Sequence, residues 1–247
     1  MKVIFLGVGE AFDEKMPNTS ILILSNNTNL LLDCGCTTPT QLWKFNDDQS
    51  FLDAIYISHP HADHYFGVPA LLYRMMEEER KKPLTIMCQD NKIIKDVIDY
   101  SYKGLYSKLG FEIKFIGVKE DETVQFNELK LLFAPTVHTI NNLAIKIDDG
   151  RNLFCYSGDG GFNENTEKLY KNSDLVIHEA YLYDEKKEGH ARIADLIKMA
   201  ERNNIKFLAL IHINRFLRRK ELESIKKRVS NKKVKVIFPN PFEEFVL

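Results

Sequence analysis

The stretch of sequence that decides the fold is Ala54-Ile55-Tyr56-Ile57-Ser58-His59-Pro60-His61-Ala62-Asp63-His64. Its first five residues form a β-rich apolar run, which predicts a buried strand from Ala54 to Ser58. Directly after this run, three of the chain's seven histidines and one aspartate fall within six residues. The strand supplies a rigid base, and the loop that follows it can turn several side chains toward one point.

The residue types in this loop indicate metal binding. Neutral imidazole nitrogen and carboxylate oxygen are the usual donors to zinc other than thiolate. Four donors in six positions cannot all serve one ion, because the linked backbone limits their approach. The segment therefore predicts two adjacent ions that share the loop. A histidine-rich surface loop is the alternative, and it accounts poorly for this cluster directly after a strand.

The rest of the chain alternates strand-rich stretches with single helices. Turn residues at Asn26-Asn27 and Asp148-Asp149-Gly150 separate pairs of apolar runs and are typical of hairpins. Strands are predicted over residues 2–6, 20–24, 29–32, 84–87, 112–116, 123–126, 129–134, 142–147, 152–157, 175–178, 207–212 and 234–238. Helical spacing predicts helices over residues 68–82, 91–110, 191–203 and 221–229. With no repeat or linker, the pattern predicts one α/β domain over residues 1–247, with two mixed sheets covered by outer helices.

Composition and charge set limits on the class of protein. The chain has 247 residues, of which 44% are hydrophobic and 28% charged, and this is enough apolar mass for a sizeable core. The formal net charge of -1 does not by itself indicate a polyanionic partner. Ten Lys or Arg and only two acids lie between Arg215 and Lys235, however. That basic run fits either a phosphate-backbone contact surface or the solvated face of an amphipathic helix, and the sequence leaves both open.

Cysteine usage and the N-terminal residues favour a cytoplasmic protein. Four scattered cysteines, Cys34, Cys36, Cys88 and Cys155, form no CxxC pair and are interpreted as reduced thiols. Residues 1–7 lack the apolar core and cleavage site of a signal peptide. No stretch approaches the ~18 apolar residues of a membrane span, so no membrane partner is expected. A homodimer is possible, but the sequence does not fix the oligomeric state.

The His-x-His-x-Asp-His loop resembles the signature of the metallo-β-lactamase superfamily. Further residues match the motifs of that superfamily in order along the chain. They are Asp33 in Leu-Leu-Asp-Cys-Gly, His138, Asp159 in Tyr-Ser-Gly-Asp and His212 in Leu-Ile-His-Ile. The resemblance implies a four-layer αββα sandwich, in which Asp33 orders the metal loop without binding metal.

The resemblance also implies the division of ligands between two zinc ions. One ion would be held by His59, His61 and His138. The second would be held by Asp63, His64 and His212, with Asp159 bridging the two. Mn²⁺ or Fe²⁺ could occupy the same donors.

Two further stretches are similar to the ribonuclease Z branch of the superfamily. His178-Glu179-Ala180 and Gly189-His190-Ala191 resemble its paired His-Glu-Ala-Thr and His-Ser-Thr motifs, although Tyr181 and Ala191 depart from them. This resemblance implies that His190, steered by Glu179, protonates the leaving group and that Asp63 orients the nucleophile. The alternative for His190 is a histidine that merely lies near a helix N-terminus. The alternative for Glu179 is an ordinary surface acid.

One departure from ribonuclease Z concerns its tRNA-binding arm. Bacterial-type ribonuclease Z inserts this arm between the residues matched here by His138 and Asp159, and only one predicted hairpin separates them in this chain. The expected function is a zinc-dependent, ribonuclease Z-like phosphodiesterase that uses a metal-bridged hydroxide. Its substrate could be RNA, a cyclic nucleotide or another small diester. The alternative is a hydrolase of the same fold that acts on a thioester, lactone or other small ester.

Overall fold

The chain folds around two seven-stranded mixed sheets. The structure, a computed structural model, describes residues 1–104 and 107–246. The first sheet contains, in spatial order, β14 (Glu244–Val246), β1 (Lys2–Gly7), β2 (Ser20–Leu24), β3 (Asn29–Leu32), β4 (Ala54–Tyr56), β5 (Leu84–Cys88) and β6 (Ile113–Gly117). The second contains β13 (Lys235–Ile237), β12 (Phe207–Ile211), β11 (Leu175–Glu179), β10 (Leu153–Tyr156), β9 (Leu143–Asp148), β8 (Leu129–Pro135) and β7 (Thr123–Phe126).

Strand direction follows the same plan in both sheets. The pairs from β14 to β3 are antiparallel and those from β3 to β6 are parallel. In the second sheet the pairs from β7 to β10 are antiparallel and those from β10 to β13 are parallel. Parallel strands bring their carboxyl ends to one edge of a sheet, and ligand sites of open α/β sheets form outside those ends.

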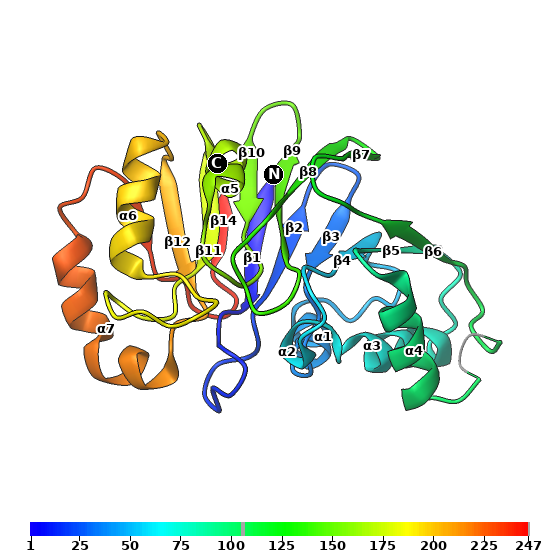
Figure 1. Cartoon of the computed structure of the whole chain (residues 1–247). Helices are drawn as coiled ribbons and strands as arrows, with labels where there is room; N and C mark the ends of the chain where they lie inside the picture. Colours follow the sequence, from blue (N-terminus) through cyan, green and yellow to red (C-terminus); the bar gives the residue numbers. More distant parts are fainter. Residues whose placement is uncertain (105–106, 247) are drawn as a thin grey trace.

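Helices cover the outer face of each sheet. They are α1 (Thr38–Phe45), α2 (Ala62–Tyr65), α3 (Val68–Glu77), α4 (Asn91–Ser101), α5 (Glu164–Tyr170), α6 (Ile193–Arg202) and α7 (Arg215–Val229). Figure 1 shows α1 to α4 on one side of the paired sheets and α6 and α7 on the other. Separate apolar clusters lie between the sheets, under α1, α3 and α4, and under α5, α6 and α7. The predicted αββα sandwich is therefore confirmed.

Strand β1 illustrates why the inner strands read as continuous apolar runs. Val3 and Phe5 belong to the cluster between the sheets, whereas Ile4 and Leu6 belong to the cluster under the outer helices. Successive side chains of a strand point to opposite faces, and here both faces are covered. The four positions from Val3 to Leu6 are therefore all apolar.

Helix α3 is shorter than the sequence predicts, ending at Glu77 instead of Lys82. Glu79 adopts a left-handed φ of 57°, which ends the helix. The next residue, Arg80, is fully buried and donates hydrogen bonds to the carbonyl oxygens of Gln49 and Leu52, both at 2.7 Å. Its guanidinium thus ties the end of α3 to the loop before β4.

Several other boundaries also differ from the predictions. Helices α1, α2 and α5 and strand β14 are present without having been predicted. Helix α4 ends at Ser101; its predicted continuation to Gly110 includes residues 105–106, which lie outside the described residues. Helix α7 begins at Arg215, six residues before its predicted start, because the Asn214 side chain accepts hydrogen bonds from the first-turn N–H groups of Phe216 and Leu217. Among the described residues, no helix is long and apolar enough to cross a membrane.

Candidate metal centre

The predicted metal loop leaves β4 and is fastened to the turn after β3. The N–H of Cys34 donates to the carbonyl of His64 at 2.7 Å, and the N–H of Gly67 donates back to the carbonyl of Cys34 at 2.8 Å. Gly35 makes this approach possible, because a Cβ at that position would lie 1.9 Å from the carbonyl oxygen of Asp63. The loop is therefore held against backbone rather than left free.

Asp33 orders the loop from the end of β3. It is fully buried with a left-handed φ of 60°. Its Oδ1 accepts the N–H of Ser58 at 2.7 Å, and its Oδ2 accepts the Nδ1–H of His64 at 2.7 Å. Asp33 itself belongs to neither donor group, and both of its oxygens accept hydrogen bonds from the loop.

The first donor group consists of His59, His61, His138 and Asp159. Their ligand atoms all lie within 4.8 Å of one another. His61 Nδ1 lies 3.0 Å from His59 Nε2 and 3.1 Å from His138 Nε2. His138 follows β8 in the second sheet, and its own Nδ1–H donates to the Gly189 carbonyl at 2.7 Å. Because Nδ1 is used in that hydrogen bond, Nε2 is the atom of His138 that is available to a metal ion.

The second donor group consists of Asp63, His64, Asp159 and His212. Asp159 Oδ1 lies 3.4 Å from His64 Nε2, and Asp159 Oδ2 lies 3.4 Å from His212 Nε2. Asp63 Oδ2 lies 3.3 Å from His64 Nε2 and 3.5 Å from His212 Nε2. Asp159 is thus a member of both groups.

The electrostatics of these groups fit bound cations. His64 Nε2, His212 Nε2 and Asp159 Oδ1 are buried without a hydrogen-bond partner, and such atoms are costly to leave unpaired. Burial alone would lower the pKa of His212, but the Asp159 and Asp63 carboxylates raise it to about 9. Burial would likewise raise the pKa of Asp159, but the His212 and His64 imidazoles hold it well below its usual range. A divalent ion would take over the charge balance that these protons provide.

The imidazoles of the first group are held neutral. Burial, with neighbouring histidines, lowers the pKa of His59 well below its ordinary value. Burial also lowers the pKa of His61 and His138. Metal-ligating histidine must be neutral, so these three side chains are already in the binding form.

The Glu179–His190 pair lies beside both donor groups. Glu179 ends β11, where its Oε1 accepts the N–H groups of Ala191 at 2.7 Å and Gly160 at 3.2 Å. Oε1 also faces His190 Nδ1 at 3.4 Å. Burial lowers the pKa of His190 to about 4, whereas burial and the Asp159 carboxylate raise that of Glu179. The structure therefore brings together the two residues that the ribonuclease Z-like motifs indicate.

Sequence reasoning missed the role of Tyr181, which stands where the ribonuclease Z motif has Thr. Its ring stacks on that of His190, with centroids 4.4 Å apart and planes 20° from parallel. The His212 ring lies near both of these rings, with its centroid 6.0 Å from that of His190 and 6.3 Å from that of Tyr181. The departure of Tyr181 from the motif was the available sequence signal, but it does not show which ring the tyrosine stacks on.

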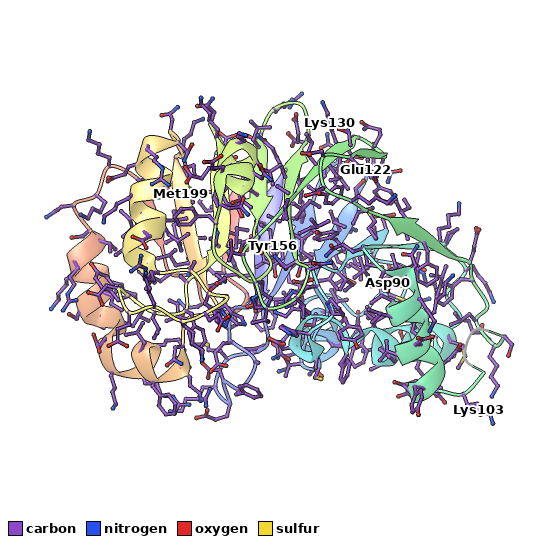
Figure 2. The ribbon with its side chains drawn as sticks, in the orientation of Figure 1. Asp90, Lys103, Glu122, Lys130, Tyr156 and Met199 are labelled. Carbon is purple, nitrogen blue, oxygen red and sulfur yellow. The ribbon has the colours of Figure 1, made fainter. Side chains whose placement is uncertain are left out.

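A cleft of about 860 Å³ opens beside His59 and His138. Its wall includes the apolar side chains Ile57, Ile93, Val118 and Leu143. Its rim carries Asp90, Glu120, Glu122 and one lysine, Lys119. Figure 2 labels Asp90, which precedes α4, and Glu122, which precedes β7. The cleft can hold an uncharged organic group next to the metal centre.

The start of the basic run is ion-paired in the structure. Arg215 Nη1 lies 2.5 Å from Glu10 Oε1. Arg218 pairs with Asp13, and Arg219 pairs with Glu14. These acids belong to the loop after β1, so part of the positive charge near His212 is neutralised within the chain.

Comparison with known proteins agrees with this geometry. The chain is similar to ribonuclease Z of Sulfolobus acidocaldarius, with 25% identity over 296 residues, covering 100% of this chain and 98% of that protein. It is 28% identical over 214 residues to "Anti-Pycsar protein Apyc1" of Paenibacillus harenae, covering 81% of this chain and 85% of that protein. The structure of the metallo-β-lactamase fold protein YhfI from Bacillus subtilis superposes with a TM-score of 0.83 at 22% identity, covering 99% and 98% of the two chains.

The fold and the two donor groups define a metal-dependent hydrolase of the metallo-β-lactamase superfamily, close to the ribonuclease Z branch. Within it, the family model described as Anti-Pycsar protein Apyc1 matches residues 1–232. The chain belongs to that family.

Proposed function

We propose that this chain is a phosphodiesterase that hydrolyses small phosphodiesters at a dinuclear zinc centre. The observation that carries the proposal is the Glu179–His190 pair beside the two donor groups. The alkoxide released from a phosphodiester is a poor leaving group and benefits from a nearby acid. A thiolate needs less help, so this pair favours a phosphodiester over a thioester. The similarity to proteins named ribonuclease Z supports the same substrate class.

Zinc bound by the two groups would supply a nucleophile at neutral pH and a Lewis acid for the phosphoryl oxygen. Asp63, whose Oδ2 lies within 3.5 Å of Nε2 of both His64 and His212, would orient the attacking water and take its proton. His190 Nδ1 faces Glu179, which leaves Nε2 for the departing oxygen. Glu179, which is itself held by the backbone N–H groups of Ala191 and Gly160, would orient the imidazole for this transfer.

Two features favour a small substrate. Between His138 and Asp159 the chain forms β9, β10 and their turns, without a projecting arm. The cleft beside the first donor group has three carboxylates and one lysine on its rim, which disfavours a second phosphate of a polyanion there. The cleft suits the organic part of a substrate that carries a single phosphate.

A substrate panel on metal-loaded protein tests the proposal. We expect close to two zinc-like ions per chain and turnover of bis-p-nitrophenyl phosphate together with at least one small natural diester. The panel should include cyclic nucleotides, short RNA, pre-tRNA and a thioester, and pre-tRNA should be cleaved weakly or not at all. Efficient, site-specific cleavage of pre-tRNA would contradict the small-substrate proposal. A clear preference for the thioester would contradict the phosphodiesterase itself.

A further inference from the structure

Two fully buried tyrosines connect the sheets by their hydroxyl groups. Tyr56 ends β4 and Tyr156 ends β10, and both side chains lie in the apolar cluster between the sheets. Figure 2 labels Tyr156 in the middle of the molecule. Tyr56 donates to the backbone carbonyl of Leu143 at 2.8 Å, whereas Tyr156 donates to Asp33 Oδ2 at 2.6 Å. The two bonds resemble each other in burial and in crossing between sheets, but only that of Tyr156 ends on a side chain that orders the metal loop.

Asp33 Oδ2 receives three hydrogen bonds. Besides Tyr156, the donors are the Ser58 hydroxyl and His64 Nδ1, both at 2.7 Å. All four side chains are fully buried, so no water competes for this oxygen. The direction in which Asp33 presents its carboxylate is therefore set by these three donors and by the Ser58 N–H on Oδ1.

These bonds reach one imidazole in each donor group. His64 gives its Nδ1–H to Asp33, which leaves its Nε2 free in the second group. The Ser58 hydroxyl gives its hydrogen to Asp33 and so accepts from His59 Nδ1, 3.0 Å away. That leaves His59 Nε2 free in the first group. A hydrogen bond from the second nitrogen of a ligating histidine fixes both its tautomer and its ring orientation.

We propose that Tyr156 is a positioning residue for both halves of the metal centre. Its hydroxyl fixes the Asp33 carboxylate, which holds His64 directly and His59 through Ser58. The second sheet thereby controls two ligands that belong to the loop of the first sheet. This inference rests on the proposed metal centre, but not on the identity of the substrate.

The experiment compares Tyr156→Phe with Tyr56→Phe. Each variant removes one buried hydroxyl that crosses between the sheets, so the general cost to folding should be similar. Zinc affinity is measured by competition with a chromophoric chelator, and the visible absorption of the Co²⁺-loaded protein reports ligand geometry. We expect Tyr156→Phe to bind zinc about tenfold more weakly and to alter the Co²⁺ spectrum. Tyr56→Phe should match the wild type in both measurements.

Each other outcome has a distinct meaning. Wild-type zinc affinity and an unchanged Co²⁺ spectrum in Tyr156→Phe would overturn the inference. Equal losses of zinc affinity in both variants would also overturn it, because Tyr156 would then only connect the two sheets. Failure of the wild-type chain to bind zinc would instead contradict the metal centre. Should Tyr156→Phe not fold, Ser58→Ala removes another donor to the same oxygen, and unchanged zinc affinity in that variant would also overturn the inference.

Discussion

Asp159 is a member of both donor groups. Its two oxygens face His64 and His212 in the second group, and it is also within reach of the three imidazoles of the first. We expect Asp159→Ala to retain about one of the two ions and to lose nearly all turnover. The fold should remain, because the three apolar clusters do not include this side chain. Elemental analysis, circular dichroism and an activity assay check these points, and full activity would show that the assignment is wrong.

His190 allows a prediction about the leaving group. If it supplies the proton, its benefit must increase with the basicity of the departing oxygen. His190→Ala should slow hydrolysis of a ribose-type diester by about 10²–10⁴-fold and that of bis-p-nitrophenyl phosphate much less, since p-nitrophenolate leaves without a proton. Glu179→Gln should show the same pattern more weakly.

Zinc content is the control for the His190 variant. It should equal that of the wild type. Equal losses on both substrates would assign His190 to binding or structure, and loss of zinc would make it a ligand instead.

His212 links the stability of the metal-free protein to pH. Its folded-state pKa of about 9 lies above the ordinary value of 6.5. The protonated His212 therefore contributes its full stabilisation of the folded state below about pH 6.5. This contribution is lost as the pH rises through about 9. For chelator-treated protein we expect the free energy of unfolding to fall by up to about 3 kcal/mol between these values. Urea denaturation measures this, and a zinc-loaded sample, which carries no proton on that nitrogen, should not show the same fall.

At the scale of elements, the loop after β1 and helix α7 are joined by ion pairs. Arg218 and Asp13 form a largely buried pair, and Asp13 Oδ1 also accepts the backbone N–H of Lys15 at 2.9 Å. A double-mutant cycle of Asp13→Asn and Arg218→Gln should give a coupling energy of about 1–2 kcal/mol. The more exposed pair of Glu14 and Arg219 serves as a matched control and should show no resolvable coupling. Equal couplings would mean that burial does not strengthen the first pair.

Most strands could be predicted from sequence because their signal is local. β2, β3 and β7 were predicted with the observed ends. Turn residues bound the apolar runs of β2 and β3, and β7 alternates polar and apolar residues. Helix α7 was predicted too short, because its first turn is basic and is stabilised by acids from residues 10–14 rather than by an apolar face. Strand β14 could not be foreseen either, because its three residues pair with β1, far away in the sequence.

The residues of the candidate site could also be predicted only where their sequence signal is local or matches a known motif. The metal loop was apparent from spacing, and the other ligands followed from the resemblance to known motifs. Tyr156 and Tyr181 were not foreseen, because their partners Asp33 and His190 come from other segments and a lone aromatic residue has no motif of its own.

At the scale of the whole molecule, the metal centre joins the two sheets. Four of its proposed ligands follow β4 in the first sheet, whereas His138, Asp159 and His212 follow β8, β10 and β12 in the second. Bound ions should therefore stabilise both sheets together. At a zinc concentration 100-fold above Kd we expect a gain of about 2.7 kcal/mol over chelator-treated protein.

Hydrogen exchange provides the measurement for this prediction. Protection should rise in strands of both sheets when zinc is added. Protection confined to one sheet would contradict a centre that spans the interface. The possible homodimer stays a prediction and is tested separately by the mass of the protein in solution.

The order of the ligands along the chain has a consequence for synthesis on the ribosome. All members of the first donor group have been translated once Asp159 is added, but the second group waits for His212, 53 residues later. At common rates of translation this interval lasts roughly 3–10 s. During that time the nascent chain contains every member of the first donor group, but the second group still lacks His212. The two halves of the centre thus become available to metal one after the other.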